Sequence, residues 1–131
     1  MTARRLISVE PGVELEAPDG VVFPVQEVRG CAVVVASGEI DLCTSPALVE
    51  ALEIAAGSSN RVILDLSDVR FLDSSGLAAM VGALDGDERR QGVALVLVGV
   101  STMVRKLLHI TCLSNRFPVY ASVDAAVAHA G

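Results

Sequence analysis

The chain has 131 residues, of which 52% are hydrophobic and 3% aromatic, and its formal net charge is −6. This length fits a single domain, and a hydrophobic content built from Ala, Val, Leu and Ile predicts a compact α/β core and excludes a disordered chain. The negative charge and the scattered basic residues disfavour direct binding to nucleic acid, and no apolar run approaches the roughly 20 residues that span a bilayer.

Residues 1–20 are expected to form an N-terminal extension ahead of a domain at 21–131. They show no sustained period and contain two prolines and two glycines. The extension is either flexible or adds an edge strand through its alternation at 13–16. An acidic stretch instead of an apolar block follows Arg4 and Arg5, so we predict no signal peptide, a cytoplasmic protein and no membrane partner.

The rest of the chain predicts five strands and four helices in the order β-β-α-β-α-β-α-β-α. Apolar, β-branched runs indicate the strands, and apolar residues at helical spacing indicate the helices. The expected strands are 21–28, 31–38, 61–66, 93–98 and 116–120. The expected helices follow the N-cap residues Ser45, Ser75, Ser101 and Ser122. A single mixed sheet packed with helices, an α/β fold, satisfies this order.

The strand expected at 61–66 is the centre of this sheet, because its apolar middle is typical of a strand buried on both faces. Arg29 and Gly30 separate the first two strands and predict a tight hairpin. Beyond the central strand, apolar residues at i, i+3, i+4 and i+7 from Leu77 predict a helix. A strand therefore leads through a loop into a helix.

The most informative stretch is Val62–Leu77, which ends in the motif Asp-Ser-Ser-Gly-Leu. It resembles the STAS family, the domain shared by bacterial anti-sigma factor antagonists and the cytoplasmic tails of sulfate transporters. In the antagonists a strand leads through a loop to this motif, and the first serine of the motif is phosphorylated. The resemblance implies that Ser74 is the phosphate acceptor.

A second match is Ser37–Asp41, which is similar to the Gly-Glu-apolar-Asp segment of the same family. A weaker match covers 100–108, and together the matches extend over about 21–131 of the chain. The resemblance places Asp41 beside the phosphorylation loop and implies a partner-facing site there. The implied partner-binding residues are Asp41, Asp73, Ser74, Ser75, Gly76 and Leu77.

Physical chemistry supports a modifiable serine at this place. Ser74 lies at a predicted helix start, where unpaired backbone N–H groups and the helix dipole favour an anion. The alternative is that Ser74 and Ser75 only cap the helix, with Ser75 expected to supply the cap. Asp73 is expected to cap the helix or to orient the serine. Gly76 is expected to allow close backbone approach, with an ordinary glycine in a turn as the alternative. Asp41 by itself indicates a turn or cap residue before Thr44.

No catalytic residue, cofactor or nucleotide cradle is predicted. Ser74 lacks the Gly-x-Ser-x-Gly context of a serine hydrolase, and the chain has no Gly-x-x-x-x-Gly-Lys-Ser/Thr loop. The two histidines, His109 and His129, are expected to have surface or packing roles rather than catalytic ones.

The three cysteines predict neither a zinc site nor an obligatory disulfide, because they are odd in number and lack Cys-x-x-Cys spacing. Cys31 and Cys112 are expected to pack as small apolar groups. Cys43 is expected to be more exposed, where a redox-sensing role is an alternative.

The resemblance implies an anti-sigma factor antagonist rather than an enzyme. Its unphosphorylated form would bind an anti-sigma factor with serine kinase activity and release a sigma factor, and phosphorylation of Ser74 would end binding. ATP and magnesium would belong to the kinase. The alternative is a non-enzymatic STAS scaffold or a transporter-associated module, for which a phosphate acceptor at the helix entry would not be needed.

Overall fold

The computed structural model describes residues 5–6, 23–85 and 93–129. The strands are β1 (Arg5–Leu6), β2 (Val25–Val28), β3 (Cys31–Ile40), β4 (Arg61–Leu72), β5 (Ala94–Val98) and β6 (Val119–Tyr120). The helices are α1 (Ser45–Ser58), α2 (Ser74–Asp85), α3 (Thr102–Ile110) and α4 (Val123–Ala128). The order of these elements confirms the predicted α/β fold and adds the short strand β1 ahead of it.

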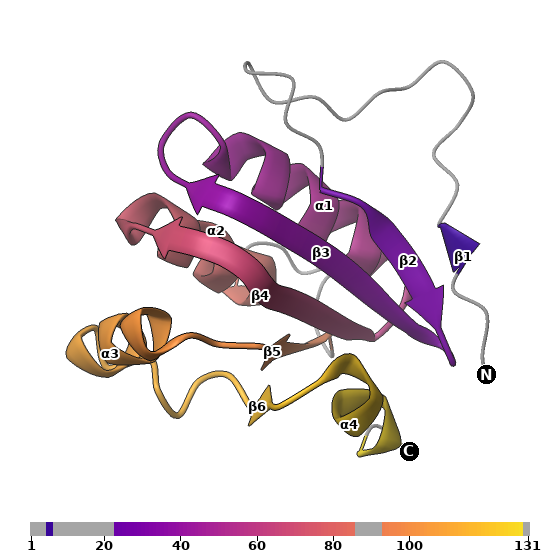
Figure 1. The fold of residues 1–131 in the computed structure, drawn as a ribbon. Helices are drawn as coiled ribbons and strands as arrows, with labels where there is room; N and C mark the ends of the chain where they lie inside the picture. Colours follow the sequence, from indigo (N-terminus) through magenta and orange to yellow (C-terminus); the bar gives the residue numbers. More distant parts are fainter. Residues whose placement is uncertain (1–4, 7–22, 86–92, 130–131) are drawn as a thin grey trace.

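All the strands of the described residues belong to one sheet, in the order β1-β2-β3-β4-β5-β6 (Figure 1). The pairs β1–β2 and β2–β3 are antiparallel, and the pairs from β3 to β6 are parallel. Leu64 of β4 lies between Val34 of β3 and Leu97 of β5. The sheet is therefore mixed, and the prediction that 61–66 lies at its centre is confirmed.

The turn between β2 and β3 has the geometry that its sequence predicts. Val28 pairs with Cys31, so the loop has two residues, Arg29 and Gly30, with φ angles of 49° and 84°. Positive φ at both positions is typical of a type I′ turn, whose twist matches that of the flanking strands. The edge strand expected at 13–16 lies outside the described residues.

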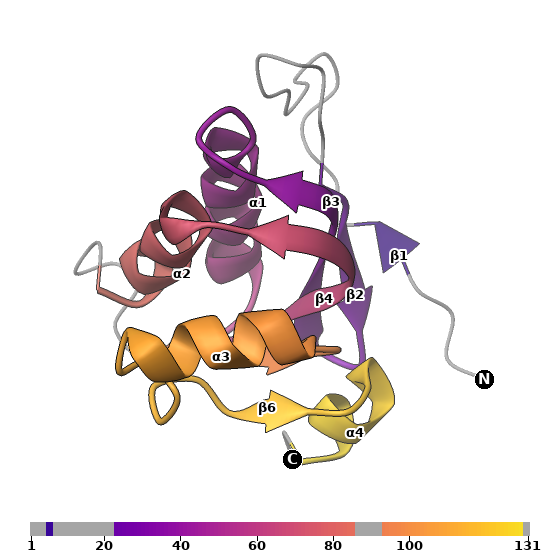
Figure 2. The same cartoon turned by 60° about the vertical axis from the view of Figure 1, so that its left-hand side comes forward.

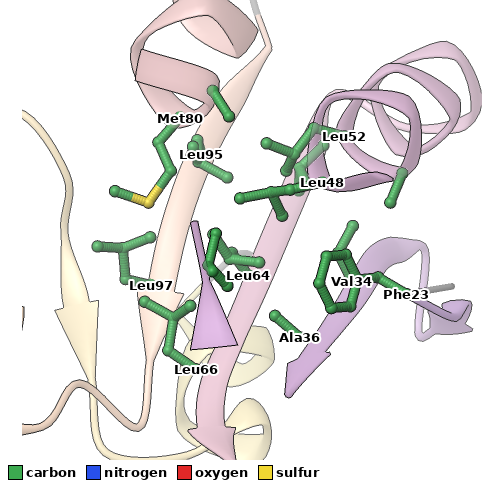
Figure 3. Close-up of a cluster of buried hydrophobic side chains, with 14 of the residues drawn as sticks. Phe23, Val34, Ala36, Leu48, Leu52, Leu64, Leu66, Met80, Leu95 and Leu97 are labelled. Atoms are coloured by element: carbon green, nitrogen blue, oxygen red, sulfur yellow. The ribbon is translucent and has the colours of Figure 1, made fainter. Parts of the chain in front are cut away.

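Helices cover both faces of the sheet, and the strands alternate between two hydrophobic clusters. Val34 faces a large cluster with α1, α2 and α3, whereas its neighbour Val33 faces a smaller cluster with α4. The turned view shows α1 and α2 on one side of the sheet and α4 on the other (Figure 2). The large cluster (Figure 3) includes Phe23, Val34, Ala36, Leu48, Leu52, Leu64, Leu66, Met80, Leu95 and Leu97.

Strand β4 continues to Leu72, so the loop expected ahead of the Asp-Ser-Ser-Gly-Leu motif is strand instead. Its register to β3 shifts twice, between Val35 and Ser37 and between Gly38 and Glu39, and each shift adds one residue to β4. These bulges break the strict alternation of buried and exposed side chains by which a strand is recognised in a sequence. The motif consequently follows the strand directly.

The last strand is shorter than predicted. β6 spans Val119–Tyr120 rather than 116–120, because the N–H of Arg116 closes a turn onto the carbonyl oxygen of Leu113 at 3.0 Å and Pro118 has no N–H for a ladder. The carbonyl oxygen of Pro118 still accepts a hydrogen bond of 2.9 Å from the N–H of Leu97.

The predicted caps Ser101 and Ser122 are confirmed, since their side chains accept from N–H groups of α3 and α4.

Candidate functional site

Two neighbouring parallel strands end side by side, and an aspartate follows each of them. Ile40 of β3 pairs with Leu72 of β4, and the next residues are Asp41 and Asp73. The N–H of Asp73 donates to the carbonyl oxygen of Ile40 at 3.1 Å. Loops at the carboxyl ends of parallel strands are the usual place for binding sites in α/β folds. The sheet thus brings the two sequence motifs together at one edge.

Asp73 is the N-cap of α2. Its Oδ1 accepts from the N–H of Ser75 at 2.8 Å, and its carbonyl oxygen accepts from the N–H of Gly76 at 3.1 Å. Ser74 is the first residue of the helix and is exposed, as predicted. The expectation that Ser75 supplies the cap is wrong, because β4 ends at Leu72 and the helix begins earlier than expected.

Gly76 and Leu77 place the helix on the sheet. A Cβ at position 76 would overlap the side chain of Leu72 and lie 2.9 Å from Cγ2 of Ile40. A larger residue would force these side chains or α2 to shift, which confirms the expected close approach of the backbone. Leu77 is buried in the large cluster with 5% of its surface exposed. These two residues therefore hold the site in place and offer it little side-chain surface.

The segment after β3 is a turn organised by Asp41. Oδ1 of Asp41 accepts from the N–H of Cys43 at 2.9 Å and from the N–H of Thr44 at 3.1 Å. This is an Asx-type turn, and it confirms the turn role expected for Asp41. Helix α1 begins at Ser45 with Thr44 as its N-cap residue, so the expectation that Ser45 is the cap is wrong. The hydroxyl of Thr44 is bound to the turn and does not cap the helix.

Two exposed apolar side chains flank the aspartates and were not singled out from the sequence. Leu42 follows Asp41 and is 77% exposed, and Phe71 lies two residues before Asp73 and is 43% exposed. Leucine in a turn carries no sequence signal of its own. Phe71 lies in the part of β4 that the sequence predicts to be a loop, so no alternation of apolar and polar residues points to it. Single exposed apolar side chains are common on protein surfaces, and these two are distinguished by their place next to the aspartates that follow β3 and β4.

Ser74 lies where the backbone of α2 favours negative charge. The exposed hydroxyl of Ser74 lies at the N-terminus of a 12-residue helix, where the dipole stabilises negative charge.

Among residues 5–6, 23–85 and 93–129, no cluster of His, Cys, Asp and Glu could hold a metal ion. His109 is exposed on α3, and His129 stacks on Tyr120 with 5.0 Å between the ring centroids.

The cysteines are in different environments and all are free thiols. Cys31 is buried, and this burial raises the pKa of its thiol, an effect that Arg61 partly opposes. Cys43 is exposed in the turn after Asp41, as expected. The expectation that Cys112 is packed inside is wrong. It is exposed in the turn after α3, with a φ of 62°.

The fold and this edge define a small α/β domain whose exposed serine, acidic turns and flanking apolar side chains suit the binding of another protein. The family model described as STAS domain matches residues 23–126. The chain belongs to the STAS domain family. In the part of the chain that the structure describes, no helix is long and apolar enough to cross a membrane.

Proteins similar to this chain are named anti-sigma factor antagonists. The anti-sigma-F factor antagonist RsfB of Mycobacterium tuberculosis is 32% identical over 114 residues, which cover 86% of this chain and 92% of that protein. The anti-sigma-B factor antagonist of Listeria monocytogenes is 41% identical over 80 residues, 60% of this chain and 69% of that protein. The crystal structure of an anti-sigma factor antagonist from Mycobacterium paratuberculosis matches with a TM-score of 0.73 and 33% sequence identity. The match covers 87% of this chain and 97% of that protein.

Proposed function

We propose that this chain is an anti-sigma factor antagonist, which binds an anti-sigma factor and so releases a sigma factor. The observation that carries the proposal is the exposed Ser74 at the first position of α2, beside the turn of Asp41. The names of the similar proteins support the same class. The function would be exercised in the cytoplasm, where sigma factors act, and it requires no enzymatic activity of the chain itself.

The partner surface of this proposal consists of the exposed and half-exposed groups at the carboxyl edge. Asp41, Asp73, Ser74 and Ser75 offer polar atoms there, and Leu42 adds an apolar side chain. Gly76 and Leu77 contribute by seating α2 against the strand ends. A protein partner would bury this mixed surface, in which apolar contacts supply affinity and polar groups fix the register.

The switch of this proposal is phosphorylation of Ser74 by the anti-sigma factor, acting as a serine kinase. The kinase would transfer the γ-phosphoryl group of ATP to Oγ of Ser74, forming the O–P bond while ADP leaves and the hydroxyl proton is released. The modification adds about −1.5 to −2 charges and three acceptor oxygens at neutral pH. A partner fitted to a neutral hydroxyl would meet bulk and charge, next to the carboxylate of Asp73.

The fold would tolerate the modified form because the charge lies outside the core. Helix α2 favours an anion at its N-terminus, whereas a partner that buries the phosphate has to remove it from water. The cost of phosphorylation therefore falls on the complex rather than on the free protein. A scaffold or a transporter-associated module would not require a phosphate that weakens the complex and leaves the free protein stable.

Release of a sigma factor tests the proposal. Purified complexes of each anti-sigma factor and sigma factor encoded in the same genome are mixed with unmodified or phosphorylated protein, and free sigma factor is quantified by size-exclusion chromatography. We expect the unmodified protein to release one sigma factor and the phosphorylated protein to release none. Failure of the unmodified protein to release any sigma factor would contradict the proposed function.

A further inference from the structure

The turn after β3 is held by a buried hydroxyl. Thr44 is 8% exposed, and within the described segments no other polar residue is buried. Its Oγ1 accepts from the N–H of Asp41 at 3.0 Å and donates to the carbonyl oxygen of Glu39 at 2.9 Å. A hydroxyl removed from water costs free energy unless its donor and acceptor capacity are used. Here both capacities are used on the backbone of one short segment.

Asp41, at the start of the same turn, accepts a second set of hydrogen bonds within it. Oδ1 of Asp41 accepts from the N–H groups of Cys43 and Thr44, and the carbonyl oxygen of Asp41 accepts from the N–H of Ser45 at 2.8 Å. Oγ1 of Thr44 lies 3.3 Å from Oδ1 of Asp41. Two side chains therefore cross-link the turn reciprocally. Leu42 projects from it with 77% of its surface exposed.

We infer that Thr44 is a positioning residue for partner binding: its hydroxyl fixes the turn at 41–44 in the conformation that presents Asp41 and Leu42 to the anti-sigma factor. This inference rests on the proposed function. Thr44 is too deeply buried to contact a partner and acts through the two residues it holds. A preformed turn spares the complex the entropy of ordering it, which is the usual benefit of preorganisation.

Ser59 provides a matched control at the opposite end of the sheet. The Ser59 hydroxyl donates to the carbonyl oxygen of Gly30 at 2.8 Å and accepts from the N–H of Arg61 at 3.1 Å, so it bridges two backbone groups as Thr44 does. Ser59 precedes β4, whereas Thr44 follows β3. Each substitution removes a hydroxyl that bridges two backbone groups, but only Thr44 lies at the proposed partner surface.

The experiment compares wild type with Thr44→Val, which keeps the shape and loses the hydroxyl, with Thr44→Ser, which keeps the hydroxyl, and with Ser59→Ala. Affinity for the anti-sigma factor is measured by calorimetry on unphosphorylated proteins. Amide hydrogen exchange at Asp41 is measured by NMR as a direct readout of the turn. Thermal unfolding shows that each variant is folded at the assay temperature, and Thr44→Ala replaces Thr44→Val if the latter unfolds.

We expect Thr44→Val to weaken binding about tenfold, the effect of roughly one lost hydrogen bond, and to speed exchange at Asp41. Thr44→Ser restores both, and Ser59→Ala changes neither. Unchanged affinity of Thr44→Val, or an equal loss in Ser59→Ala, overturns this inference and leaves the proposed function standing. If unmodified wild type binds no anti-sigma factor, the proposed function fails and the inference fails with it.

Discussion

The N–H of Asp73 donates a hydrogen bond of 3.1 Å to the carbonyl oxygen of Ile40, which ties the entry of α2 to the end of β3. Asp41 follows Ile40 directly, so the backbone of the sheet fixes the two aspartates relative to each other. The site therefore depends on the pairing of β3 with β4 and on the seating of α2 against both strands.

Substitution of Gly76 tests this seating. Gly76→Ala places a methyl group against Leu72 and Ile40, and overpacking of this kind costs about 1–3 kcal/mol. We expect a loss of that size in the free energy of unfolding, measured by urea denaturation, together with weaker partner binding because α2 is displaced.

Gly82 supplies the control within the same helix. A Cβ at this position meets nothing within 4 Å. Gly82→Ala should leave stability unchanged or raise it by up to about 1 kcal/mol, because alanine favours helix. Equal effects of the two substitutions would show that helix propensity, rather than the contact with Leu72, governs position 76.

Asp73 allows capping to be separated from charge. Asp73→Ala removes the acceptor for the N–H of Ser75 and should cost about 1 kcal/mol of unfolding free energy. Asp73→Asn keeps an acceptor and should stay within about 0.5 kcal/mol of wild type, since both residues are good N-caps. Thermal and urea unfolding of the two variants measures the difference. If Asp73→Asn loses as much unfolding free energy as Asp73→Ala, then the charge of Asp73, and not its capping hydrogen bond, stabilises the start of α2.

Thiol labelling distinguishes the three cysteines. Cys43 and Cys112 are exposed and should react with iodoacetamide in the native protein, whereas buried Cys31 should react only after unfolding. Burial also raises the pKa of the Cys31 thiol. The folded protein therefore holds this proton more tightly than the unfolded chain. The free energy of unfolding should be insensitive to this thiol below the ordinary thiol pKa of about 8.5, and should fall as the pH rises from there through the raised pKa of the folded protein. Peptide mapping after timed labelling checks the order.

Leu42 should contribute to binding but not to folding. Leu42→Ala removes a side chain that is 77% exposed, so we expect the free energy of unfolding to change by less than about 0.5 kcal/mol. Affinity for the anti-sigma factor should fall about tenfold, as for a leucine buried on binding. Ile110→Ala is the control, because Ile110 is 74% exposed on α3 and lies outside the proposed surface. An unchanged affinity of Leu42→Ala would remove Leu42 from the surface.

Most of the architecture follows from the sequence because local signals agree with the tertiary fold. Three local patterns predict features that the structure contains. These are the apolar centre of β4, the Arg29–Gly30 turn and the helix caps at Ser101 and Ser122. The position of Ser74 at a helix start follows in the same way, from helical spacing just after it.

The errors arise where long-range pairing overrides local pattern. Two bulges against β3 carry β4 to Leu72 and move the start of α2, so Asp73 rather than Ser75 becomes the cap. The burial of Thr44 depends on contacts of the turn with the end of β3, which no local pattern reveals. Cys112 lies exposed in a turn after α3 with a positive φ angle, a backbone conformation that a cysteine in the sequence does not predict.

In the proposed function, the hydroxyl of Ser74 is the switch. The most direct test treats wild type, Ser74→Ala and Ser75→Ala with the cognate anti-sigma kinase and ATP, maps phosphate by mass spectrometry, and measures binding by calorimetry before and after treatment. We expect one phosphate at Ser74 in wild type and in Ser75→Ala, with binding lost, and no phosphate in Ser74→Ala, with binding retained. Stoichiometric phosphorylation of Ser74→Ala, or equally tight binding by phosphorylated and unmodified wild type, would show that the hydroxyl of Ser74 is not the switch.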